Sequence, residues 1–102
     1  MDIIRGTTPT IRFKFKTVDP ADIVVAYLNI WQTTDSGIEK DIEQAEVGED
    51  YIQWSLSQEE TLSLDPDLTG NYECRYRTED NQAYKTQKRD FHVIDVKKGG
   101  VI

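Results

Sequence analysis

The chain has 102 residues and a formal net charge of −7, with 37% apolar and 30% charged side chains. This length allows one domain to bury a core without metals or disulfides, and the composition excludes a disordered tail. No apolar run approaches the about 20 residues of a membrane span, and the first residues lack the layout of a signal peptide. We therefore expect one domain, residues 1–102, that is cytoplasmic when synthesised and makes no membrane contact.

The negative charge is concentrated in the middle of the chain. From Asp35 to Asp67 there are eleven acidic side chains and a single cation, Lys40. An acidic balance argues against nucleic acid, because duplex binding uses Lys and Arg to neutralise phosphates. The simplest interpretation is a solvated acidic face. The alternative is that this face opposes a basic one and supports contacts between unlike surfaces, with these cations on the basic side: Arg12, Lys14, Lys16, Arg75, Arg77, Lys85 and Lys88.

The first strands are predicted from their alternation of apolar and polar residues. Residues 10–17 place Ile11, Phe13 and Phe15 on one face. Residues 23–32 are apolar on both faces in part, which indicates a central strand. Two phases are open there, one burying Ala26, Leu28 and Ile30 and the other burying Val25, Tyr27, Asn29 and Trp31. The first is preferred because it avoids burying an unpaired Asn29.

The acidic middle third contains two further strands. Residues 38–45 alternate, although Ile38 and Ile42 would also share one side of a helix. We predict an edge strand in which Lys40 faces inward and discourages pairing with another sheet. Residues 51–57 follow as a strand with Ile52, Trp54 and Leu56 inward. A helical turn then begins after Ser57, a plausible N-cap, and crosses between sheets.

The last third predicts a hairpin of two strands. In residues 71–78 every second side chain is predicted to face the core. Residues 83–96 carry apolar side chains in two alternating phases, and a bulge near Val93 would reconcile them. Six or seven strands with short turns indicate an antiparallel sandwich. We expect its core to contain the following side chains: Phe13, Phe15, Leu28, Ile30, Ile52, Trp54, Leu56, Tyr72, Cys74 and Phe91.

The chain offers no set of residues suited to catalysis. Cys74 is the only cysteine and lies among apolar neighbours, so we interpret it as a small core residue. His92 is the only histidine, no spacing resembles a zinc motif, and no serine has the glycines of a nucleophile elbow. We therefore expect no enzymatic activity, no metal and no cofactor.

The segment DLTGNYECRY resembles the tyrosine corner of immunoglobulin-superfamily domains at Gly70, Tyr72 and Cys74. In that motif the tyrosine hydroxyl bonds to the backbone a few residues upstream, which here is the turn at 65–69. The partner cysteine and an inward-facing Trp are missing. The resemblance implies an immunoglobulin-like sandwich, with a structural role for Tyr72.

The two ends of the chain, MDIIRGTTPTIRFKF and FHVIDVKKGGVI, resemble those of small phage and prophage proteins encoded among tail and baseplate genes of Gram-positive hosts. LNIWQ resembles the Gln-ended central strand of these proteins, and LSQEETLSL resembles their crossover segment. The resemblance implies an all-β, immunoglobulin-like antiparallel β-sandwich of about seven strands, related to the N-terminal domain of upper baseplate proteins. It also implies a non-enzymatic role in a tail or baseplate or in its assembly. A virion location is the alternative to the cytoplasm if the chain leaves as part of such an assembly.

Six outward-facing side chains are the candidate partner-binding residues: Tyr27, Trp31, Arg12, Lys14, Arg75 and Arg77. The expected partners are other phage tail or baseplate proteins, and a homo-oligomer is a further expectation. A carbohydrate-binding or adhesion module that uses the exposed aromatics Tyr27 and Trp31 is the alternative function.

Overall fold

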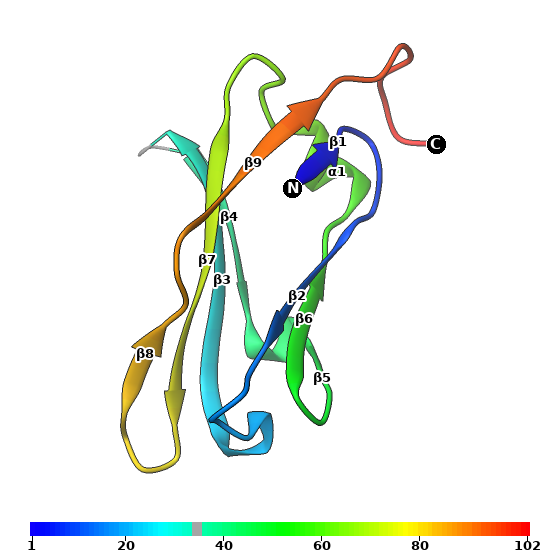
Figure 1. The fold of residues 1–102 in the computed structure, drawn as a ribbon. Helices are drawn as coiled ribbons and strands as arrows, with labels where there is room; N and C mark the ends of the chain where they lie inside the picture. The colour runs from blue at the N-terminus through cyan, green and yellow to red at the C-terminus, as the bar shows by residue number, and fades with distance from the viewer. Residues whose placement is uncertain (34–35) are drawn as a thin grey trace.

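The computed structural model describes residues 1–33 and 36–102 as two β-sheets packed face to face (Figure 1). The predicted all-β, immunoglobulin-like sandwich is confirmed. The segment TTDSG, residues 33–37, has the composition of a turn and lies partly outside the described residues. The strands are β1 (Asp2–Ile4), β2 (Thr10–Lys14), β3 (Ile23–Thr33), β4 (Ser36–Asp41), β5 (Glu46–Val47), β6 (Tyr51–Ser55), β7 (Gly70–Thr78), β8 (Ala83–Lys85) and β9 (Arg89–Ile94).

The order of the strands is that of an immunoglobulin variable-type sandwich. In the larger sheet the order is β1-β9-β7-β3-β4, with β8 also paired to β7, and in the smaller sheet it is β2-β6-β5. These correspond to a GFC sheet extended by C′ and to a BED sheet. All neighbours are antiparallel except β1 and β9, which are parallel. The short strands β1, β5 and β8 raise the number in the described part of the chain above the predicted seven.

The connection from β6 to β7 contains the predicted helical turn, α1 (Gln58–Leu62). Ser57 is its N-cap and forms a capping box with Glu60. The Glu60 N–H donates to Ser57 Oγ at 3.1 Å, and the Ser57 N–H donates to Glu60 Oε1 at 2.8 Å. The box satisfies two backbone donors that the start of a helix leaves free. Two 3₁₀ turns, η1 (Pro20–Asp22) and η2 (Ile42–Gln44), complete the helical segments of the described chain.

The strand predicted over 38–45 ends earlier than expected, at Asp41. The Asp41 carboxylate accepts a hydrogen bond from the Glu43 N–H at 3.0 Å, and the Asp41 N–H donates to the Gln44 side chain at 3.0 Å. This second capping box begins η2, so Ile42 lies in a helical turn rather than in the strand. An Asp side chain competes with strand pairing by binding the backbone that follows it.

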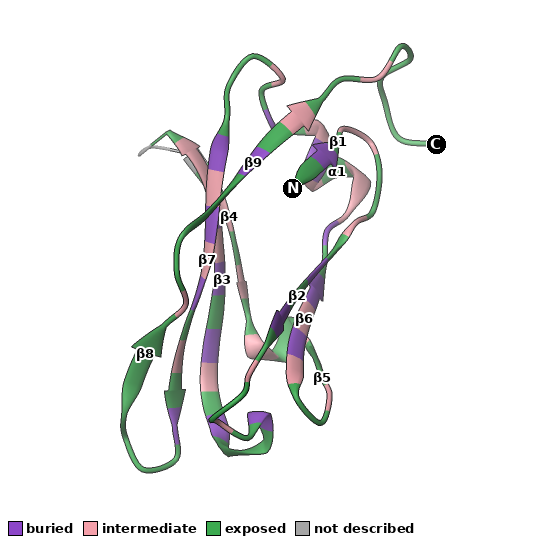
Figure 2. Cartoon of the chain, in the orientation of Figure 1, coloured by how far each residue is buried: buried purple, intermediate pink, exposed green. Residues whose placement is uncertain are grey.

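The core confirms the preferred phase of β3. Ala26 and Leu28 are fully buried and Ile30 is 1% exposed, and Figure 2 shows buried residues alternating with intermediate or exposed ones along much of β3 and β7. Phe15 is the one predicted core residue that is only partly buried. It lies beyond the end of β2, where its ring meets the edge of Tyr76 at a centroid distance of 5.0 Å. Ile11 and Ala26 are buried too, as the alternation predicted, and the buried apolar side chains that the prediction did not name are Ile3, Ile23 and Leu64.

Polar contacts join the two sheets beside β4, which lies at an edge of the larger sheet. Lys40 faces inward, as predicted, and its Nζ lies 2.9 Å from Glu60 Oε1 with the side chain only 13% exposed. Burial raises the pKa of the Glu60 carboxyl, but hydrogen bonds from the Ser57 N–H and Lys40 outweigh it and leave the pKa below its ordinary value. The indole N–H of Trp54 donates to the Asp41 carbonyl at 2.8 Å.

The bulge predicted near Val93 lies instead at residues 86–88. Lys85 pairs with Arg75 and Arg89 pairs with Tyr72, so three residues of one strand oppose two of β7. Thr86 occupies the break, where its hydroxyl accepts from the Cys74 N–H at 3.0 Å and its N–H donates to the Cys74 carbonyl at 2.8 Å. A threonine side chain thus replaces a backbone acceptor. Val93 stays packed against the core and Ile94 faces solvent.

The turn at 65–69 is held by Gln32, and the tyrosine-corner hydrogen bond expected from Tyr72 is absent among the described residues. The Gln32 amide donates to the carbonyls of Asp65 at 2.8 Å and Leu68 at 3.1 Å, and it accepts from the Asp65 N–H at 2.8 Å. The Tyr72 ring contacts Phe13 and Phe91. Gln32 lies at the end of β3 beside the turn, so its amide occupies the place expected for the hydroxyl.

The segment RGTTP, residues 5–9, connects the larger sheet to the smaller one and binds α1. Arg5 donates to Asp95 at 2.6 Å and to the Leu62 carbonyl at 2.9 Å. Gly6 adopts φ +79°, which favours glycine, and its N–H donates to Thr61 Oγ1 at 3.0 Å. Buried Thr61 donates in turn to the Thr7 carbonyl at 2.9 Å. The segment therefore closes one end of the sandwich.

We predict that Gln32→Ala lowers the free energy of unfolding by about 1–2 kcal/mol, because three hydrogen bonds that tie the turn to β3 are lost. Tyr72→Phe should change it by less than about 0.5 kcal/mol, because the hydroxyl makes no such bond. Urea denaturation of both variants beside the parent chain measures the two effects. A larger loss for Tyr72→Phe than for Gln32→Ala would contradict the assignment.

We expect Trp54→Ala to lower the free energy of unfolding by about 3–5 kcal/mol, because it leaves a cavity between the sheets. Trp54→Phe should cost less, since it keeps most of the packing but loses the indole hydrogen bond to Asp41. The control is Val47→Ala, at a side chain 45% exposed, which should fall within about 0.5 kcal/mol of the parent. Equal urea midpoints for Trp54→Ala and the control would contradict a shared core.

Candidate protein-binding face

The phase of β3 also decides which of its side chains face solvent. With Ala26, Leu28 and Ile30 directed into the core, Val25, Tyr27, Asn29 and Trp31 lie on the opposite side of the larger sheet. Tyr27 is 41% exposed, and Trp31 is partly buried. We call this side the outer face and define it by these four residues and their outward-facing neighbours on β4, β7 and β8. Figure 1 shows no described helix or loop packed over it.

Strand pairing places four outer-face side chains in one row. Arg75 is the register partner of Lys85 on one side and of Tyr27 on the other, and Tyr27 is the partner of Asp41. Directly paired residues share a face, so the row runs Lys85, Arg75, Tyr27, Asp41 across β8, β7, β3 and β4. All four residues are exposed.

Shorter rows flank this central one. On one side Arg77 pairs with Val25 and Ala83, and on the other Asn29 pairs with Glu73 and Glu39. A shallow depression of about 240 Å³ opens beside the central row and is lined by Val25, Tyr27, Arg75, Tyr76, Arg77 and Ala83. The outer face is thus a nearly continuous sheet surface with one aromatic residue in its central row.

Charge changes sign across the outer face. Arg75, Arg77 and Lys85 lie on β7 and β8, and Glu39 and Asp41 lie on β4. Lys85 Nζ lies 3.4 Å from Glu73 Oε1, a contact at a side chain that is 54% exposed. Within residues 1–33 and 36–102, the other four charges form no ion pair. The face therefore has a basic side and an acidic side, both open to solvent.

Two of the predicted site residues, Arg12 and Lys14, belong to a different surface. They lie on β2, on the outward side of the smaller sheet, where Arg12 Nε donates to Gln53 Oε1 at 2.9 Å. The Arg12 guanidinium also covers the Tyr51 ring at 3.8 Å. The fold brings Tyr27, Trp31, Arg75 and Arg77 together and places Arg12 and Lys14 across the sandwich from them.

The expected separation of an acidic side from a basic side is wrong at the scale of the whole molecule. The cations occupy both outward surfaces, because β2 belongs to one sheet and β7 and β8 to the other. The acidic segment is also divided, with Glu39 on the larger sheet and Glu46 on the smaller one, where it accepts a hydrogen bond from Gln53. Asp35, the first residue of that segment, lies outside the described residues.

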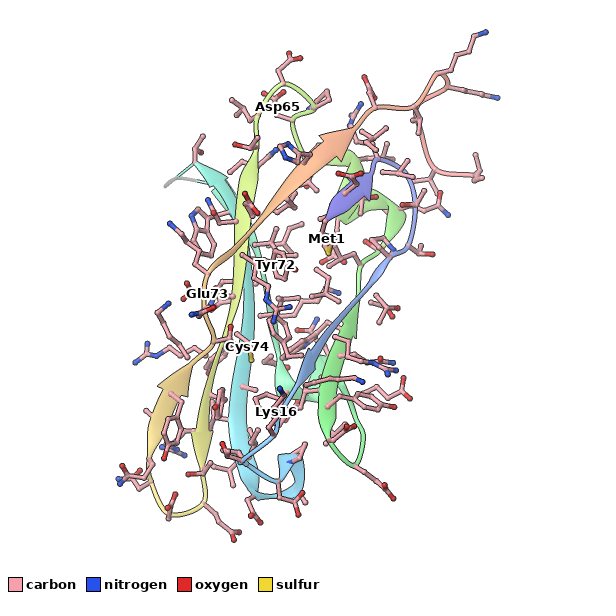
Figure 3. The ribbon with its side chains drawn as sticks, viewed as in Figure 1. Met1, Lys16, Asp65, Tyr72, Glu73 and Cys74 are labelled. Carbon is pink, nitrogen blue, oxygen red and sulfur yellow. The ribbon has the colours of Figure 1, made fainter. Side chains whose placement is uncertain are left out.

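The two other residues considered for chemistry have ordinary positions. Cys74 is fully buried, and burial raises the pKa of its thiol to about 12. Figure 3 shows Cys74 and Tyr72 on the side of β7 that faces the smaller sheet, with Glu73 directed away. His92 is exposed on β9. The described residues contain no group of three or more His, Cys, Asp or Glu that could hold a metal ion.

No protein-family model matches the chain, and a search of curated proteins likewise finds no significant match. Among the described residues, no helix is long and apolar enough to cross a membrane.

Three outer-face residues, Lys85, Asp41 and Glu39, were not among the six predicted site residues. The sequence did point to Lys85, since it belongs to the cations expected on the basic side. Asp41 and Glu39 alternate with inward Ile38 and Lys40, so their outward direction was predictable. Their position beside Tyr27 depends on the pairing of β3 with β4, which the sequence does not specify.

We predict that the Cys74 thiol reacts slowly with a disulfide reagent at pH 8, because the raised pKa and full burial keep the reactive thiolate scarce. The rate in native buffer should be at least about a hundredfold lower than in urea, where the thiol recovers its ordinary pKa. Absorbance of the released thiolate measures both rates. Prompt stoichiometric labelling of the folded chain would contradict this placement.

Proposed function

We propose that the chain is a non-enzymatic structural or assembly component of a phage or prophage tail or baseplate, and that it acts through protein–protein contacts on its outer face. The observation that carries the proposal is the row of exposed Lys85, Arg75, Tyr27 and Asp41 on an uncovered sheet surface. Protein interfaces are enriched in Tyr and Arg, which supply contact area together with directional polar groups.

Resemblance of the chain ends to tail and baseplate proteins supplies the biological setting. The RGTTP segment makes structural contacts with α1 and, through the Arg5 N–H, with the Ile94 carbonyl at the end of β9, so its presence fits a shared framework rather than a binding motif. The partner surface is then sought elsewhere. The outer face offers the exposed Tyr27 ring together with Arg75 and Asp41, which form no ion pair within residues 1–33 and 36–102. In this proposal the chain is made in the cytoplasm and joins other tail or baseplate proteins in the virion.

A second candidate is a carbohydrate-binding or adhesion module. It is favoured by Tyr27 and Trp31, which share the outer face and are four residues apart on one strand. That separation is about 13 Å along a strand, suited to two sugar rings of an extended glycan. A glycan array with the parent chain and Trp31→Ala tests it. A signal lost on that substitution would favour this candidate over the first.

The proposed function predicts that the chain is found in tail or baseplate assemblies and that outer-face substitutions remove it from them. A tagged copy is expressed in the host strain during prophage induction, and particles are purified and probed for the tag. Tyr27→Ala combined with Arg75→Glu should reduce the particle-bound fraction at least about tenfold, because both change exposed contact residues.

The matched control is Lys14→Glu, a charge reversal on the outward side of the smaller sheet. It should leave incorporation unchanged. Parent chain absent from purified particles, with the tag accessible, would overturn the proposal. Equal loss for the control and the outer-face variant would overturn the assignment of the contact to the outer face.

A further inference from the structure

The central row of the outer face is complementary in charge and chemistry to the same row of a second copy when the order of its residues is reversed. Across β8, β7, β3 and β4 it runs cation, cation, aromatic ring, anion: Lys85, Arg75, Tyr27, Asp41. A second copy placed face to face, with a two-fold axis in the interface parallel to the strands and between β7 and β3, presents this row reversed. Lys85 then faces the Asp41 position of the second copy, and Arg75 faces the Tyr27 position.

Each of these pairings is chemically favourable and occurs twice, because a two-fold interface uses the same surface on both copies. Lys85 with Asp41 is an ion pair, and Arg75 over the Tyr27 ring is a cation–π contact. In the flanking rows, Arg77 faces apolar Val25 and Glu73 faces Asn29, so no like charges oppose each other directly. A two-fold axis across the strands would instead place the basic side over the basic side.

Pairing through sheet edges is disfavoured at the acidic edge. On β4 the inward Lys40 is bound to Glu60 and occupies the space at the edge of the sandwich. An inward-pointing charge on an edge strand discourages continuation of the sheet. The outer face carries no such obstacle in the described chain.

We propose that the outer face is a homodimer interface in which the partner is a second copy of this chain, arranged about that two-fold axis. This inference rests on the proposed function, because it names the partner of the surface that the function uses. The dimer is salt-sensitive, since its contacts join exposed charges and the Debye length falls from about 10 Å at 0.1 M to about 3 Å at 1 M.

Sedimentation equilibrium of the chain at low and high salt is the first measurement. The dimer should dissociate more readily at about 1 M than at about 0.1 M salt. Lys85→Glu should raise the dimer dissociation constant at least about tenfold at low salt, because two like-charged pairs replace two ion pairs. Lys14→Glu changes net charge equally and should have no comparable effect.

The decisive test mixes two variants that cannot pair with themselves. Lys85→Glu and Asp41→Lys each place like charges together in their own homodimer, whereas one copy of each restores both opposite-charge pairs. Native mass spectrometry of the mixture should therefore show a heterodimer and little of either homodimer. Asp41→Asn keeps an N-cap for η2 and removes only the charge, so it should weaken the dimer several-fold even if Asp41→Lys folds poorly.

A parent chain that is monomeric at both salt concentrations, or a mixture that forms no heterodimer from folded variants, would overturn the homodimer. The outcome for the proposed function is separate. Failure to dimerise while the chain still enters particles through Tyr27 and Arg75 would remove the second copy as partner and leave the proposed function in place. A dimer with the expected charge pairing, together with the absence of the chain from particles, would keep the homodimer and overturn the proposed function.

Discussion

The alternation of side chains along β3 is the constraint on which the rest of the structure depends. This strand lies between β4 and β7, and it directs Ala26, Leu28 and Ile30 into the core. A register shift of one residue would expose Leu28 and bury Asn29 without a partner, so the packed core strongly selects one register. The same selection turns Tyr27 and Trp31 outward. The inward phase of β3 therefore fixes both the residues of the core and the residues of the candidate site.

Polar contacts join elements of the sandwich at one edge and at one end. Lys40 and Glu60 meet at the edge beside β4, and Arg5 and Thr61 bind the crossing segments at the end near α1. Glu60 serves two purposes, since it also closes the capping box of α1. Contacts of this kind join groups from distant parts of the chain, and each leaves a poorly solvated polar group behind if its partner is removed. They restrain the frame that presents the outer face.

The RGTTP segment and the proposed binding residues occupy different parts of the molecule. The RGTTP segment binds α1 and the end of β9, whereas Arg75 and Tyr27 lie on inner strands of the larger sheet and Asp41 lies on its edge strand, β4. A framework and an interface place different demands on a sequence, because a framework needs particular backbone geometry and an interface needs exposed complementary groups.

The sequence by itself determined the features that depend on neighbours along the chain. Alternation predicted the inward phase of β3 and the inward Lys40, and Ser57 predicted the start of α1, because each follows from local geometry. Only the tertiary structure decided which strands share a sheet. Arg12 and Arg75 lie on opposite surfaces because their strands belong to different sheets. The bulge lies at Thr86 rather than near Val93, and the turn at 65–69 is hydrogen-bonded by Gln32 instead of Tyr72. Each of these outcomes depends on the register between distant strands, which is selected by packing of the whole core and has no signature in any one segment.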